Sequence, residues 1–124
     1  MTKEKLEIYK CEICGNLVQV LLTGAGELVC CNQPMTLQNI QHDKSDLGEK
    51  HAPVVETHDD KKIVQVKSHP MLKEHYIQFI EVIDKNKNEV HLKYFEPETL
   101  PEFDISCLND DIKAIEFCNI HGLW

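Results

Sequence analysis

The sequence lacks arginine, has few aromatic residues and contains no long apolar run. All 13 basic residues are lysines, and the formal net charge is −8. Because arginine supplies bidentate phosphate recognition and an acidic surface repels polyanions, we expect no nucleic-acid partner and no anionic membrane partner. No stretch approaches about 18 consecutive apolar residues, and no apolar segment follows the charged N-terminus. The sequence therefore predicts neither secretion nor a membrane span, and we expect a cytoplasmic protein.

Six cysteines and seven histidines are the feature that remains to be explained in this chain of 124 residues. In a reducing compartment, cysteines bind metals or carry out redox chemistry more often than they form structural disulfides. The composition therefore indicates a metalloprotein.

The two ends of the chain differ in character. Four cysteines lie in the first quarter, where residues 17–22 form the main apolar run and residues 24–26 a glycine-containing turn. A segment this short rarely folds without disulfides, a metal or a partner. We therefore expect a metal-dependent domain at residues 1–37 and a second domain at residues 38–124.

The second domain is predicted to be mainly β. Short runs rich in β-branched and aromatic residues alternate with turn-like polar segments, a pattern typical of a β-sandwich. Residues 75–83 could also form an amphipathic helix, but their isoleucine, valine and phenylalanine content favours a strand. The expected strands are residues 54–57, 62–67, 75–83, 89–95 and 112–117.

The first candidate metal site consists of four cysteines. Cys11 and Cys14 flank two residues and precede Gly15, so their sulfurs can face one ion across a tight turn. Cys30 and Cys31 are adjacent, and both reach one ion only if the backbone turns there, because neighbouring side chains of a strand point to opposite faces. The spacing leaves iron, structural zinc and a disulfide set open. It predicts that removing the metal unfolds residues 1–37.

The second candidate site combines histidines with one cysteine. Cys118 and His121 are three residues apart, His69 and His75 lie on either side of a proline-containing turn, and His51 follows a glutamate and a lysine. Taken singly, each is more commonly a surface or core residue than a ligand. If all five converged, they would exceed the tetrahedral set that zinc prefers and would favour iron.

Together these segments resemble the superoxide reductases. The resemblance lies in Glu-Lys-His at residues 49–51, His-Pro-Met followed by His at 69–75, and Cys-Asn-Ile-His-Gly-Leu-Trp at 118–124. With the four-cysteine segment, which is similar to desulforedoxin, the whole chain resembles desulfoferrodoxin, the two-iron class of that family. The resemblance implies a small desulforedoxin-like domain followed by an immunoglobulin-like β-sandwich, usually assembled as a homodimer.

The resemblance also implies a ligand set and an activity. One iron would be held by four thiolates, and the other by four equatorial imidazoles and an axial thiolate, with a sixth position open to superoxide. The implied ligands of the first iron are Cys11, Cys14, Cys30 and Cys31, and those of the second are His51, His69, His75, Cys118 and His121. The activity would be one-electron reduction of superoxide to hydrogen peroxide, with electrons from a rubredoxin-like donor.

Two residues of the first motif are expected to act at the catalytic site. Lys50 would attract the anionic substrate, since it lies within the Debye length of about 8 Å from a ligand histidine. By family analogy, Glu49 would bind the oxidised iron once peroxide has left.

Outside the motifs, Cys107 is expected to be a buried thiol rather than a ligand, and three histidines are expected on the surface: His42, His58 and His91. The alternatives are a non-catalytic iron electron carrier and a zinc-dependent binding module.

Overall fold

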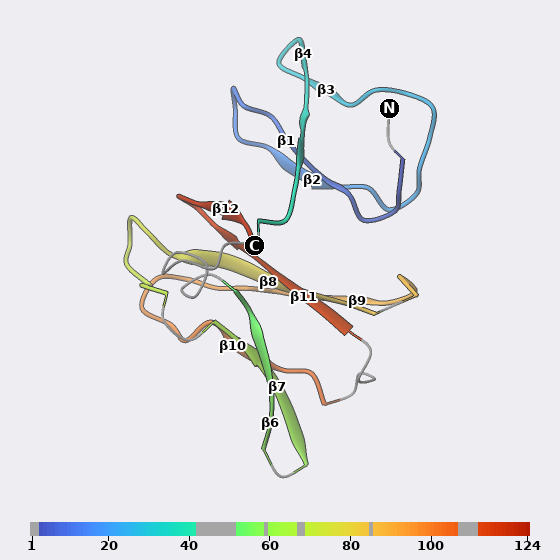
Figure 1. Cartoon of the computed structure of the whole chain (residues 1–124). Coiled ribbons are helices and arrows are strands. Elements are labelled where there is room, and N and C mark those ends of the chain that lie inside the picture. The colour runs from blue at the N-terminus through green and yellow to red at the C-terminus, as the bar shows by residue number, and fades with distance from the viewer. Residues whose placement is uncertain (1–2, 42–51, 59, 67–68, 85, 107–111) are drawn as a thin grey trace. The chain divides into compact units, whose positions relative to one another are not determined.

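The computed structural model describes residues 3–41, 52–58, 60–66, 69–84, 86–106 and 112–124, with the side chain of His58 excepted. The chain divides into two compact units, Met1–Asn39 and Ile40–Trp124. The described residues form strands and turns without a helix, as the sequence predicts (Figure 1). None of them, in consequence, belongs to a helix long and apolar enough to cross a membrane.

The first unit contains a three-stranded antiparallel sheet and a short hairpin. The sheet order is β2-β1-β5, and β3 pairs with β4. The bounds are β1 Ile8–Lys10, β2 Leu17–Gln19, β3 Val29–Cys30, β4 Gln33–Pro34 and β5 Thr36–Gln38. Its buried apolar side chains among the described residues are Ile8, Tyr9, Cys11 and Val20. So few buried side chains provide little hydrophobic stabilisation, which fits a unit whose fold depends on a metal.

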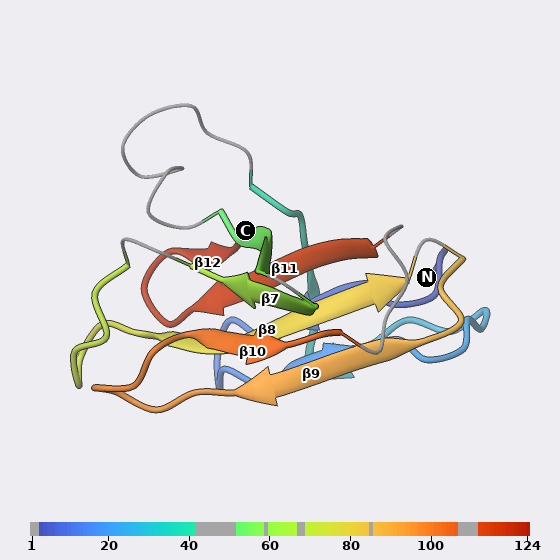
Figure 2. The ribbon, with the colours of Figure 1, turned by 90° about the horizontal axis from the view of Figure 1, so that it is seen from below.

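The second unit is an antiparallel β-sandwich. A three-stranded sheet of order β10-β7-β6 packs on a four-stranded sheet of order β12-β11-β8-β9 (Figures 1 and 2). The bounds are β6 Val54–His58, β7 Lys61–Gln65, β8 Ile77–Asp84, β9 Val90–Tyr94, β10 Glu102–Asp104, β11 Ile112–Cys118 and β12 Gly122–Leu123. The core between the sheets contains Val64, Val66, Ile77, Ile80, Val82, Phe95 and Ile105. This architecture confirms the expected sandwich.

The central strand β8 decides the question that the sequence left open for residues 75–83. It pairs with β11 along seven residue positions and with β9 along five, so it is a strand and not a helix. It begins at Ile77 because the preceding residues form a tight turn, in which the backbone groups of Leu72 and His75 bond each other at 2.9 and 3.1 Å. His75 is therefore placed on a loop at the end of the sheet, where a ligand can face a metal.

Candidate metal centres

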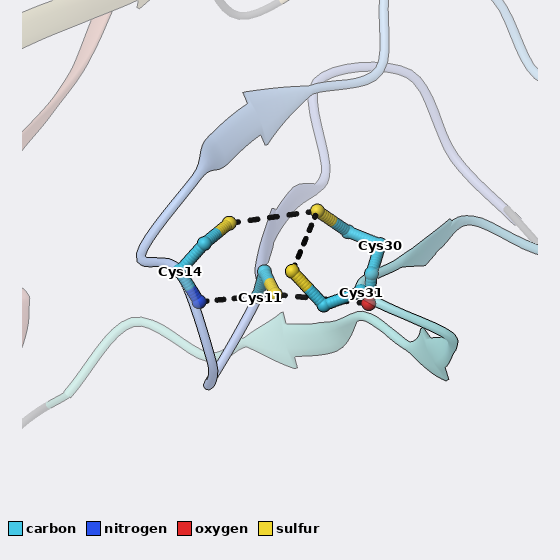
Figure 3. Close-up of side chains that lie close together, drawn as sticks. All are labelled: Cys11, Cys14, Cys30 and Cys31. Carbon is cyan, nitrogen blue, oxygen red and sulfur yellow. Dashed lines mark hydrogen bonds between the residues drawn. The ribbon is translucent and has the colours of Figure 1, made fainter.

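Four cysteine side chains converge in the first unit. Figure 3 shows the thiols of Cys11, Cys14, Cys30 and Cys31 pointing toward one another, and all four sulfurs lie within 4.8 Å of each other. The sulfur of Cys30 is 3.5 Å from that of Cys14 and 4.0 Å from that of Cys31. In a tetrahedral site with metal–sulfur bonds of about 2.3 Å, sulfurs lie about 3.8 Å apart. The geometry fits a four-thiolate metal site.

Two backbone turns place these sulfurs. Gly15 has a φ of 85°, a value that glycine adopts without strain, and it donates its N–H to the carbonyl of Cys11 at 2.9 Å. Cys31 and Asn32 have φ values of 54° and 61°, in the left-handed region. The turned backbone therefore brings adjacent cysteines to the same ion, as the sequence analysis required.

The protonation of the cysteines shows what a cation would contribute. The N–H of Cys14, 3.5 Å from the Cys11 sulfur, lowers the pKa of Cys11 to about 6. Hydrogen bonding with the Cys14 and Cys11 thiols raises the pKa of Cys31 to about 12. Without a cation, the cluster thus retains protons between its sulfurs. A bound metal ion replaces those protons, because a coordinating thiol is deprotonated outright.

The second cluster lies at one end of the sandwich. Nε2 of His69 is 3.2 Å from the sulfur of Cys118, and Nδ1 of His121 is 3.9 Å from it. The rings of His69 and His75 are 4.7 Å apart, and those of His75 and His121 are 5.0 Å apart. One potential ligand atom from each of these four residues lies within 4.8 Å of the others. Three nitrogens and one sulfur thus converge from distant parts of the chain.

His69 is set up as a neutral metal ligand. Its Nδ1 is 2.6 Å from the carbonyl of Pro70, so Nδ1 donates there and Nε2 keeps its lone pair toward Cys118. Burial lowers the pKa of His69 and also that of His75. Both imidazoles are therefore neutral at pH 7, which is the form that binds metal ions.

Cys118 is fully buried, and two backbone groups face its sulfur. The N–H groups of Ile120 and His121 donate to it at 3.4 Å each. Burial raises the pKa of the Cys118 thiol, whereas these two hydrogen bonds favour the thiolate. The sulfur therefore occupies a dry site with donors already oriented toward its negative charge.

Asn119 joins the two ligand loops, a role that the sequence analysis did not identify. Its side-chain oxygen accepts the N–H of Tyr76 at 2.9 Å, and its side-chain nitrogen donates to the carbonyl of Glu74 at 3.1 Å. Its backbone N–H donates to the carbonyl of Tyr76 at 3.2 Å. The loop bearing His75 is thereby held against the turn bearing Cys118. The only sequence signal for this role is the position of Asn119 next to a ligand cysteine.

Several residues singled out in the sequence lie outside the described residues. These are His42, Glu49, Lys50, His51 and Cys107. His91, expected on the surface, lies half-buried on β9. The described part of the second cluster is therefore His69, His75, Cys118 and His121, and a fifth ligand remains a prediction from the resemblance.

A buried carboxyl group lies two residues from Cys118. Glu116 on β11 is 0% exposed and is paired in register with Ile80, a residue of the core between the sheets. Burial raises the pKa of Glu116 to about 9. At pH 7 the group is therefore neutral, and it adds little negative charge beside the thiolate.

This raised pKa predicts how stability changes with pH. Between about pH 4.5 and pH 9 the unfolded chain releases the Glu116 proton and the folded chain keeps it, so the free energy of unfolding falls as pH rises. The loss is at most about 1.4 kcal/mol per pH unit. Glu116→Gln removes this loss. The urea midpoint of the variant minus that of the parent should therefore increase steadily from pH 5 to pH 8. A constant difference across that range would contradict the prediction.

The described residues form strands and turns, with a four-cysteine cluster in the first unit and a cluster of three histidines and one cysteine in the second. This combination defines a metalloprotein with one candidate centre in each unit. The family model described as the desulfoferrodoxin N-terminal domain matches residues 3–38, and the model described as desulfoferrodoxin matches residues 43–124. The chain belongs to the desulfoferrodoxin family.

Individual relatives extend this result to most of the chain. The chain is 47% identical over 123 residues to the desulfoferrodoxin of Syntrophotalea carbinolica, covering 98% of this chain and 95% of that protein. It is 53% identical over 32 residues to the desulforedoxin of Megalodesulfovibrio gigas, covering 26% of this chain and 86% of that protein. The crystal structure of the superoxide reductase from Treponema pallidum has a TM-score of 0.67 at 27% identity, covering 97% of this chain and 95% of that structure.

The two clusters fit two iron centres, as in desulfoferrodoxin. The expectation of two irons per chain is confirmed at this level, since four thiolates suit one iron and a mixed set of imidazoles and thiolate suits another. The described residues offer four candidate ligands for each centre.

Proposed function

We propose that this protein is a superoxide reductase, which converts superoxide, one electron and two protons into hydrogen peroxide. The observation that carries the proposal is the convergence of His69, His75 and His121 on the buried sulfur of Cys118. The similarity to the superoxide reductase from Treponema pallidum over nearly the whole chain supports it. The test is the stoichiometry of the reaction. We expect one peroxide per superoxide consumed and no oxygen evolution, whereas a dismutase would release oxygen and a pure electron carrier would show no rapid turnover.

Iron bound at this cluster supplies the reducing electron and the positive charge that attracts the substrate. The protein residues control that chemistry. Cys118 would help to hold the iron, and its thiolate would supply electron density that makes bound substrate easier to protonate. The neutral imidazoles of His69 and His75 add no negative charge, so the anionic substrate meets less repulsion at this centre than at the four-thiolate centre.

The proposed site is larger than the described cluster. His51 would complete the set as a fourth imidazole, so that four histidines and Cys118 would hold the iron that reduces superoxide. The four-thiolate iron would belong to a separate domain at residues 1–37, followed by the catalytic domain at residues 38–124. The two family-model matches, to residues 3–38 and 43–124, support a boundary in this region.

Lys50 is proposed to guide superoxide into the site. The protein has a net charge of −8, but at physiological salt only charges within about 8 Å of the site act strongly. Lys50→Ala should therefore lower the bimolecular rate constant with superoxide by about ten- to a hundredfold and weaken its salt dependence. Pulse radiolysis at several ionic strengths measures both quantities. An unchanged rate constant would remove Lys50 from the mechanism.

Glu49→Ala is the matched control for this experiment, because it changes the neighbouring residue and removes a negative charge. Glu49 is proposed to hold the oxidised iron after peroxide has left. The control variant should keep the fast reaction with superoxide and lose the ferric spectrum that reports a bound carboxylate. If that spectrum persists, the role assigned to Glu49 is wrong.

The electron donor and the assembly are also proposals. A rubredoxin-like carrier is the proposed donor, because a small redox protein suits a transient contact with an acidic protein.

A cytoplasmic homodimer is the proposed form. Apolar side chains around a groove of about 560 Å³ in the first unit support a protein interface, since Leu21 and Leu22 there are 69% and 83% exposed. A monomer in sedimentation velocity at micromolar concentration would contradict the dimer.

A further inference from the structure

Gln41 lies between the two family-model matches and outside all three ligand motifs, yet it contacts the loop that carries a ligand. Its side-chain nitrogen donates to the carbonyl of His121 at 2.5 Å and to that of Leu123 at 3.2 Å. Its backbone N–H also donates to the carbonyl of Leu123, at 3.1 Å. Three hydrogen bonds thus attach Gln41 to the C-terminal hairpin of the second unit.

Hydrogen bonds restrain both peptide groups that flank His121, and Gln41 supplies one of them. On one side, the N–H of His121 donates to the sulfur of Cys118 at 3.4 Å. On the other side, the carbonyl of His121 accepts from Gln41 and, at 3.2 Å, from the indole N–H of Trp124. Fixing both peptide planes fixes the backbone dihedrals of His121. The backbone thereby fixes the point and direction from which the side chain leaves, and from there Nδ1 lies 3.9 Å from the Cys118 sulfur.

Gly122 allows Gln41 to come this close. Its φ is 83°, a backbone conformation that glycine adopts without strain. A Cβ atom at this position would lie 3.2 Å from the side-chain nitrogen of Gln41, closer than ordinary van der Waals contact. The glycine therefore provides both the turn that reverses the chain after His121 and the space that the amide occupies.

We propose that Gln41 is a positioning residue of the histidine–thiolate centre. By donating to the His121 carbonyl, it holds the imidazole in place and aligns the N–H that faces the Cys118 sulfur. Partners that orient a metal ligand from outside the ligand set typically change metal affinity about ten- to a hundredfold when removed. The inference rests on His121 and Cys118 as ligands, and its readouts do not depend on superoxide.

The test compares three substitutions in the full-length, iron-loaded protein. Gln41→Ala removes the donor, Gln41→Glu replaces the amide with a carboxylate of the same shape, and Gln41→Lys keeps N–H donors. The measurements are the energy of the sulfur-to-iron absorption band of the second centre and the rate of iron loss to a chelator. We expect Gln41→Ala and Gln41→Glu to shift the band in the same direction and to lose iron about tenfold faster. Gln41→Lys should stay close to the parent.

Charge alone would give a different pattern. If only charge mattered, Gln41→Glu and Gln41→Lys would shift the sulfur-to-iron band in opposite directions, and Gln41→Ala would resemble the parent. That result would overturn the proposal. Parental behaviour in all three variants would overturn it too. The absorption of the four-thiolate iron is an internal standard for protein concentration, and a parental urea midpoint of the second unit is the control for its folding. Gln41 is exposed, so its replacement opens no core. Superoxide turnover of the parent tests the proposed function independently.

Discussion

Replacing Cys118 with serine should remove the sulfur-to-iron absorption band of the second centre and lower the rate constant with superoxide by at least about a hundredfold. The sulfur is fully buried, with Nε2 of His69 3.2 Å away and two backbone N–H donors at 3.4 Å. A serine hydroxyl fills most of the space but supplies a poorly ionised oxygen in place of a soft thiolate. The donors would then face a neutral group, and the iron would lose the electron density that the thiolate supplies.

Cys14→Ser provides the matched control, since it makes the same chemical change in the other centre. It should alter only the four-thiolate absorption and leave the superoxide reaction of the second centre close to that of the parent. Visible spectra and pulse radiolysis of both variants separate the two centres. Survival of the second-centre band in Cys118→Ser would show that Cys118 does not bind the second iron.

The four-cysteine cluster shows how far sequence spacing predicts a site. The pair Cys11 and Cys14 with Gly15 already indicates a metal turn, because the spacing itself defines the local geometry. The adjacent pair Cys30 and Cys31 predicts only that the backbone must turn. Asn32 is a residue type that often adopts positive φ, whereas the positive φ of Cys31 could not be predicted from its side chain.

The long strands of the sandwich could be predicted from the sequence, but the short strands could not. β8 and β11 are long and rich in β-branched residues, so their type is evident from composition. The short strands β1 and β10, which cover Ile8–Lys10 and Glu102–Asp104, were not anticipated. Each has three residues. Ile8 and Tyr9 favour a strand, but runs this short become strands only through pairing with their neighbours.

The residues that orient the ligands were the least predictable part of the second centre. The histidines and Cys118 could be found because their side chains are chemically distinctive. Asn119 and Gln41 act through hydrogen bonds to backbone carbonyls, and those carbonyls are present at every residue. Which of them an amide reaches depends on tertiary contacts across as many as 82 positions, so Gln41 has no local signal and Asn119 has only its place beside Cys118.

Loss of the first metal should unfold the first unit and leave the second one folded. The described first unit has few buried apolar side chains, and one of them is the ligand Cys11. Structural zinc sites with similar ligands contribute about 10–16 kcal/mol of binding free energy, more than a unit of this size gains from burial alone. In the full-length protein, Cys11→Ser should therefore abolish hydrogen-exchange protection in residues 1–37.

Limited proteolysis followed by mass spectrometry measures the same change as new cleavage sites in that segment. The second unit has its own apolar core, so its strands β8 and β11 should stay protected in Cys11→Ser. Cys118→Ser is the control, because it should leave the first unit as protected as in the parent. If Cys11→Ser or chelation of the first metal left residues 1–37 protected, the small hydrophobic core would be sufficient for folding, and the four thiolates would serve only the chemistry of the iron.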